Sequence, residues 1–185
     1  NSTYKSKTSF GWGNATGTAR WNHIISPKLF SNTSVVSSFY ELAIKAEELN
    51  NDTSQFALRY GSGIQDYSLK QDFDWYANNN HKVKYGFVAT QHTFTPDALV
   101  LTSAFFDERI NRKTIYKSIE TGSYIQDEWK ISQRMKTLVG LRLSTFTSED
   151  KTYVNPEPRV AISYNLKQDL ALKASYATMN QYVHL

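Results

Sequence analysis

Alternation of apolar and polar residues is the feature of this chain that most constrains its fold. Residues 157–179 read EPRVAISYNLKQDLALKASYATM, and a short polar stretch, Lys167–Asp169, divides this segment into two halves. A repeat of two residues is typical of a β-strand, whose successive side chains point to opposite faces. The segment therefore predicts two strands with one apolar face each. The residues on that face are Val160, Ile162, Tyr164 and Leu166 in the first half and Leu170, Leu172, Ala174 and Tyr176 in the second.

The same alternation recurs through the rest of the chain. It is clear in three segments and weaker in two more, and one further segment is strand-like by composition but has two poorly distinguished faces. The clear segments are 67–76, 81–90 and 136–146, the weaker ones are 13–25 and 29–44, and the last is 123–132. Together these segments predict an all-β fold, an antiparallel up-and-down meander of about eight long strands.

The connections between these segments alternate in length. Short polar connections are expected at 26–28, 77–80, 132–135 and 167–169, and long ones at 45–55, 93–114 and 147–157. Every short turn therefore falls at one end of the sheet and every long loop at the other. Outer-membrane barrels have this arrangement, with short periplasmic turns and long extracellular loops. The pattern favours a transmembrane β-barrel.

The tryptophans support the same interpretation. Trp21, Trp75 and Trp129 each lie a few residues before a short turn, and aromatic rings gather at membrane–water boundaries. The alternative is that each ring packs in the core of a soluble sandwich. We expect the three to form a membrane girdle, with the apolar face toward lipid and the polar face toward the lumen.

Composition excludes several classes of protein. The 185 residues carry a net charge of +4 with scattered cations, which does not indicate nucleic-acid binding. Cysteine is absent and the four histidines are dispersed, so the sequence predicts no metal site. No nucleophile elbow, HExxH motif or phosphate-binding loop is present. We expect neither an enzyme nor a cofactor.

Several segments together carry a family resemblance. They are GWGNATGTARWNHIISPKLFSNTS, GIQDYSLKQDFDWYANNNHKVKYGF, SYIQDEWKIS followed by LVGLRLS, and NPEPRVAISYNLKQDLALKASYATMNQYVHL. In this order they resemble the barrel domain of TonB-dependent outer-membrane receptors of the Bacteroidetes type. The segments cover most of the chain, and each alone is a loose pattern.

The resemblance implies a bacterial outer-membrane protein that takes up a scarce nutrient such as an iron chelate or a vitamin. Its barrel would have about 22 strands and would hold a plug domain that the TonB complex engages. Outer-membrane lipid and a surface lipoprotein are further partners that it suggests. The chain shows no plug-like segment, no TonB box and no terminal aromatic residue. We therefore expect residues 1–185 to be an internal piece of the barrel, with the plug and remaining strands absent.

The resemblance also assigns candidate site residues. Substrate contacts in such receptors come from the long loops and the plug, which implicates Phe105, Phe106, Arg109 and Tyr153. Cations on the polar strand faces would line the lumen and pair with plug carboxylates, although cross-strand pairing explains them equally well. These cations are Arg20, Arg142, Arg159 and Lys173.

A second interpretation is a self-contained eight-stranded barrel. It would be either a small outer-membrane protein or a soluble lipocalin-like binder of small molecules. The two forms differ in which face of the sheet is interior, and the sequence does not decide this.

Overall fold

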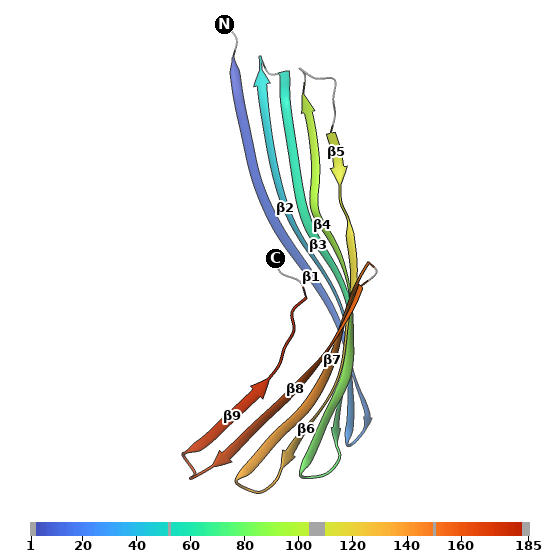
Figure 1. Cartoon of the computed structure of the whole chain (residues 1–185), viewed down its shortest axis with the longest axis vertical. Coiled ribbons are helices and arrows are strands. Elements are labelled where there is room, and N and C mark those ends of the chain that lie inside the picture. Colours follow the sequence, from blue (N-terminus) through green and yellow to red (C-terminus); the bar gives the residue numbers. More distant parts are fainter. Residues whose placement is uncertain (1–2, 52, 104–109, 150, 183–185) are drawn as a thin grey trace. The chain divides into compact units, whose positions relative to one another are not determined.

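The computed structural model describes residues 3–51, 53–103, 110–149 and 151–182, and all regular structure in them is β-strand (Figure 1). The strands form one sheet in the order β1-β2-β3-β4-β6-β7-β8-β9, and the short β5 pairs with β4. Their bounds are β1 (Tyr4–Ser26), β2 (Leu29–Asn50), β3 (Thr53–Tyr76), β4 (His81–Ser103), β5 (Ile110–Lys113), β6 (Tyr116–Lys130), β7 (Met135–Ser148), β8 (Lys151–Asn165) and β9 (Ala171–Ala177). This order confirms the predicted all-β meander.

The long strands pass through two compact units. Unit 1 comprises Asn1–Gly17, Ser37–Tyr67 and His92–Lys117, and unit 2 comprises Thr18–Val36, Ser68–Gln91 and Ser118–Leu185. Unit 2 contains the short turns between β1 and β2, β3 and β4, β6 and β7, and β8 and β9. It therefore contains the segments whose alternation was clearest in the sequence.

The register of β7, β8 and β9 confirms the two faces expected in unit 2. Val139 lies opposite Val160, which in turn lies opposite Tyr176. Residues directly opposite in an antiparallel ladder share a face, so the three strands present one continuous apolar face. On the other side, Arg142 lies opposite Glu157. We call these the apolar face and the polar face.

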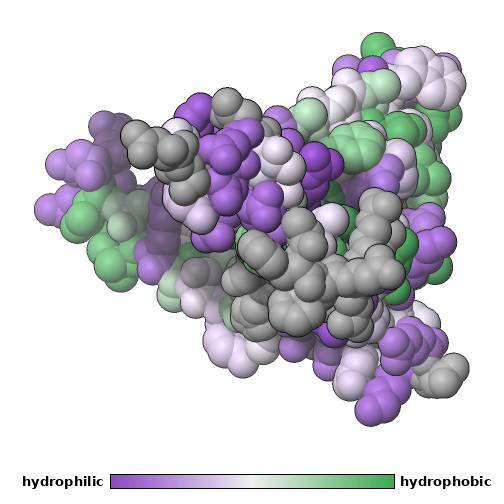
Figure 2. Space-filling view, turned by 90° about the horizontal axis from the view of Figure 1, so that it is seen from above, coloured by the Kyte–Doolittle hydropathy of each residue, from purple (hydrophilic) through white to green (hydrophobic). Residues whose placement is uncertain are grey.

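The apolar face is not covered by any other part of the chain that the structure describes. Among those residues Leu49 is the only buried hydrophobic side chain, and hydrophobic residues lie openly on the molecular surface (Figure 2). A large uncovered apolar surface marks a membrane or protein contact. No described helix is long and apolar enough to cross a membrane.

The prediction of three long loops was wrong, because most of their described residues lie in strands. Two of them are strand pairs that extend to tight turns, and the third is partly strand, because β4 continues to Ser103 and pairs with β5. The turns at Asn51 and Glu149 use a positive φ, of 46° and 52°, a conformation that Asn tolerates better than most residues. Polar side chains suggested loops, but backbone pairing satisfies the peptide groups of a strand whatever its side chains are. The count of about eight strands becomes nine because of β5.

The ladder between β8 and β9 ends at a proline. Its last register pair is Arg159 with Ala177, after which Thr178 donates its N–H to the carbonyl of Pro158 at 3.1 Å. In a strand the N–H and C=O of one residue point the same way, so the missing N–H of Pro158 would have faced β9. Pro156, two residues away, lacks its donor on the same side. The chain leaves the sheet here and crosses the polar face.

Candidate functional site

An ion-pair network occupies the middle of the polar face in unit 2. Glu157 is only 4% exposed, and its Oε1 accepts hydrogen bonds from the Ser144 hydroxyl at 2.8 Å and the Asn180 N–H at 3.2 Å. Arg142 approaches from β7, with Nε 3.6 Å from Oε2 of Glu157 and Nη2 3.9 Å from Oε1 of Glu120. The buried carboxylate is thus compensated by one cation and two types of donor, as burial of a charge requires.

Tyr182 covers this network from the segment that follows β9. Its ring stacks on Phe146 with centroids 5.1 Å apart, and its hydroxyl oxygen accepts a hydrogen bond from Asn155 Nδ2 at 2.8 Å. The same hydroxyl lies 2.8 Å from Oγ of Ser144, which donates to Glu157. If Tyr182 donates to Ser144, the hydroxyls form a relay that ends on the carboxylate, and each bond polarises the next.

A second link crosses the sheet nearer the short turns. Tyr124 on β6 donates its hydroxyl to Oδ1 of Asp72 on β3 at 2.6 Å, although β4 lies between these two strands. Gly86 on β4 has no side chain to block the path, and a Cβ there would lie 3.1 Å from Asp72. Lys70 completes the group, with Nζ 3.0 Å from Oδ2 of Asp72.

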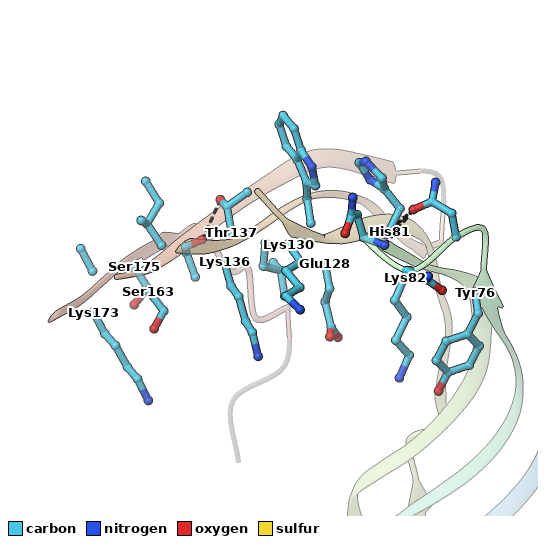
Figure 3. Close-up of a pocket in the computed structure, with 18 of the residues that line it drawn as sticks. Tyr76, His81, Lys82, Glu128, Lys130, Lys136, Thr137, Ser163, Lys173 and Ser175 are labelled. Carbon is cyan, nitrogen blue, oxygen red and sulfur yellow. Dashed lines mark hydrogen bonds between the residues drawn. The ribbon is translucent and has the colours of Figure 1, made fainter. Parts of the chain in front are cut away.

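Lysines dominate the end of the polar face beside the short turns. They line a groove of about 1080 Å³ together with Tyr76 and Glu128. Figure 3 shows the side chains of Lys82, Lys130, Lys136 and Lys173 projecting toward one side of the sheet. The lysines in its lining are Lys28, Lys82, Lys130, Lys136 and Lys173.

The apolar face holds a pairing of histidine with carboxylate that sequence reasoning missed. Asp127 lies opposite Val139 and is 2.6 Å from Nδ1 of His81, whose ring stacks on Trp129 at 5.4 Å between centroids. This pair explains why the faces of 123–132 were hard to distinguish. Only the register, which joins residues far apart in sequence, identifies it.

Unit 1 carries its own exposed ion pair. Arg112 donates from Nε to Oδ2 of Asp97 at 2.9 Å. The hydrogen bonds that Asp97 accepts from Arg112 and Thr114 hold its pKa below its ordinary value. Asp97 lies well beyond the first 9–11 or so residues of β4, the length that a tilted strand needs to cross a membrane. The pair fastens β5 to β4 at this point.

The structure describes five of the eight residues expected to contact substrate or line the lumen. Arg20 donates to Ser34 at 3.2 Å, Arg142 belongs to the ion-pair network, and Arg159 and Lys173 lie on the polar face. Tyr153 is 52% exposed but lies within β8, so its assignment to a loop was wrong. The other three, Phe105, Phe106 and Arg109, lie outside the described residues.

The three tryptophans near short turns are exposed on the apolar face. Trp21 is 65% exposed, Trp75 44% and Trp129 43%. Each adjoins a polar-face residue along its strand, namely Arg20, Asp74 and Glu128 in the same order. All three belong to unit 2, each on a strand that ends at a short turn. Their role in a membrane girdle remains a prediction.

Fluorescence quenching tests this prediction. Variants that keep one tryptophan, the others replaced by Phe, are reconstituted in bilayers whose lipids are brominated either near the headgroup or deep in the acyl chain. We expect Trp21, Trp75 and Trp129 each to be quenched more strongly by the shallow bromine. Trp12, in unit 1, is 72% exposed and is the control. If the shallow bromine quenches Trp12 as strongly as it quenches the other three tryptophans, the girdle prediction is contradicted.

The fold and its two faces define the class of this protein as an antiparallel membrane barrel wall, apolar on one side and charged on the other. A sequence profile for the family described as TonB dependent receptor-like, beta-barrel matches residues 1–179. The chain belongs to this family, whose members are bacterial outer-membrane receptors and transporters rather than enzymes. No curated protein and no solved structure matches the chain.

Proposed function

We propose that the chain forms part of the barrel wall of a receptor that imports a scarce nutrient, such as an iron chelate or a vitamin, with energy supplied through the TonB complex. The observation that carries this proposal is the division between the faces in unit 2. One face exposes Val139, Val160 and Tyr176, whereas the other holds the compensated charges of Arg142 and Glu157. Lipid suits the first face and a hydrated lumen the second.

The alternative of a closed eight-stranded barrel is not supported by the described strands. Their order runs from β1 to β9 without a pairing between these two edges. A lipocalin-like binder would also need its apolar face enclosed, and here that face is uncovered. We propose instead that further strands of the polypeptide complete the wall, because unpaired edges invite other strands.

The same proposal includes three specific partners of the barrel wall. A plug domain would rest against the polar face, the TonB complex would act through the plug, and a surface lipoprotein would contact the outer end. Substrate contact is proposed for Tyr153, whose exposed ring lines a hollow of about 590 Å³ with Phe146 and Tyr182. The same role is proposed for Phe105, Phe106 and Arg109.

Energised uptake is tested in cells. A strain that lacks the gene is compared with its parent for uptake of radiolabelled ferric chelates and of cobalamin, with and without a protonophore. We expect the deletion to abolish protonophore-sensitive uptake of one compound, and the full-length gene to restore it. Uptake of that compound that depends on the gene but persists with the protonophore would indicate a passive pore. Unchanged uptake of every compound would remove support for these nutrients.

A further inference from the structure

One side of β8 is only partly paired in unit 2. On its other side β7 pairs with β8 from Lys151 to Tyr164, whereas β9 pairs only with Arg159–Asn165. The chain leaves the sheet after Ala177, so β9 ends well short of the far end of β8 (Figure 1). Within the part of unit 2 that the structure describes, no strand pairs with residues 151–157 on this side. We call this stretch of β8 the open edge.

Two prolines make the open edge tolerable inside a membrane. Unpaired backbone groups are costly in hydrocarbon, which is why membrane barrels close. At Pro156 and Pro158 the missing N–H is the one that would have faced away from β7, so proline removes donors that would otherwise lack a partner. The carbonyl of Pro158 accepts the N–H of Thr178 at 3.1 Å. A longer β9 would find no N–H at either proline, so the open edge is a stable feature of the wall.

The open edge begins at the level of the outer leaflet in the proposed barrel. A tilted strand crosses a membrane in about 9–11 residues. Counted along β8 from Asn165, beside the short turn, this length ends near residues 155–157. Pro156 and Pro158 therefore lie in the leaflet farther from the short turns. This step rests on the proposed function, because it takes the sheet as a membrane barrel whose short turns are periplasmic.

The surfaces on both sides of the open edge are apolar or aromatic. On the apolar face, Leu143 lies opposite Pro156 and is 44% exposed. On the polar face, Tyr153 lies opposite Phe146, on whose ring Tyr182 stacks. These three aromatic rings line the hollow of about 590 Å³. At the open edge, aromatic rings thus replace the charges that the polar face carries in its middle, and they suit an aliphatic partner.

We propose that the open edge is a lateral opening in the barrel wall, through which an aliphatic chain of an outer-leaflet lipid reaches the lumen. Strands lie about 4.8 Å apart, so one absent strand leaves a gap about as wide as a single extended chain. The lipid chain passes Leu143 and Pro156 and lies against Tyr153 in the hollow. Substrate contact is also proposed for Tyr153, so a bound substrate displaces the lipid chain.

Photocross-linking of the full-length protein in cells tests the proposal. Benzoylphenylalanine, which reacts with aliphatic C–H bonds, replaces Tyr153, and mass spectrometry identifies the captured molecule. We expect a lipid adduct at this position and none at Thr90, on the polar face of β4, a strand paired on both sides. Leu143→Asp should lower the lipid yield about tenfold, because a charge beside the opening opposes an aliphatic chain. Ile125→Asp, at a 57% exposed position of the apolar face on β6, should leave the yield unchanged.

The other outcomes overturn the inference. Capture of peptide alone at Tyr153 shows that a protein segment fills the opening, and the absence of any adduct shows that no lipid chain enters. Equal lipid capture at Thr90, or an unchanged yield in a folded Leu143→Asp variant, shows that lipid does not enter at the open edge. The comparison of Tyr153 with Thr90 decides the question even if Leu143→Asp does not fold. The readout is independent of transport, so energised uptake without a lipid adduct refutes this inference alone.

Discussion

Replacing Glu157 by Ala is expected to lower the free energy of unfolding by about 3 kcal/mol. The change removes the carboxylate that compensates Arg142, and the Ser144 hydroxyl loses its charged acceptor. The Ser144 hydroxyl is buried under the segment that carries Tyr182, where water replaces the lost partner poorly. Urea unfolding of the full-length protein in detergent micelles or bilayers measures the loss.

Two control variants distinguish the effect of breaking the ion-pair network from the effect of removing one negative charge. Glu41→Gln, at an exposed position of β2, should change stability by no more than about 0.5 kcal/mol. The double variant Arg142→Met with Glu157→Leu should recover most of the loss, because apolar residues can replace a buried ion pair at little cost. Equal stability of the wild type and the Glu157→Ala variant would show that the network does not stabilise the barrel.

The faces of the sheet were predictable because they depend only on local alternation. Val160 and Tyr176 were placed on one face by counting along the chain, and the register confirms that they are directly opposite. Arg142 and Arg159 were assigned to the polar face in the same way. No long-range information was needed, since the side of a strand on which a residue lies follows from its parity.

The partners of these residues were not predictable, because they depend on register and on breaks in pairing. The sequence predicts that Glu157 ends a loop, whereas its burial follows from the return of the chain over the polar face after β9. The bond from Tyr124 to Asp72 joins residues on strands that are not neighbours. Local alternation contains neither fact.

The positions of the lysines were likewise only partly predictable from local alternation. The sequence places Lys173 on the polar face, whereas Lys130 and Lys136 are ordinary residues beside a turn, and no local pattern distinguishes them. The three lysines line up only when four strands are aligned, with Ser163 on β8 between Lys136 on β7 and Lys173 on β9. Cross-strand alignment gathers cations that are scattered in the sequence on one part of the polar face, which composition alone does not show.

Gly86 is the position where a single added methyl group should do the most damage. A Cβ at Gly86 would lie 2.3 Å from the backbone oxygen of Gln71, a distance that no side-chain rotation relieves. Gly86→Ala must therefore move β3 away from β4, and we expect it to cost about 2–3 kcal/mol. The same shift would strain the bond between Tyr124 and Asp72. Urea unfolding and the heat-sensitive mobility of the folded barrel on gels measure the effect.

Two other glycines make this prediction specific. At Gly122 the nearest atom to an added Cβ is Nη2 of Arg142, at 2.7 Å, which belongs to the far end of a flexible side chain. Gly122→Ala should therefore be milder than Gly86→Ala, because the far end of the Arg142 side chain can shift slightly, whereas the backbone oxygen of Gln71 cannot. Gly17, which has nothing within 4 Å, should accept Ala without loss. If all three variants lose stability equally, the cause is the general cost of changing a strand glycine and not the close approach of β3 to β4.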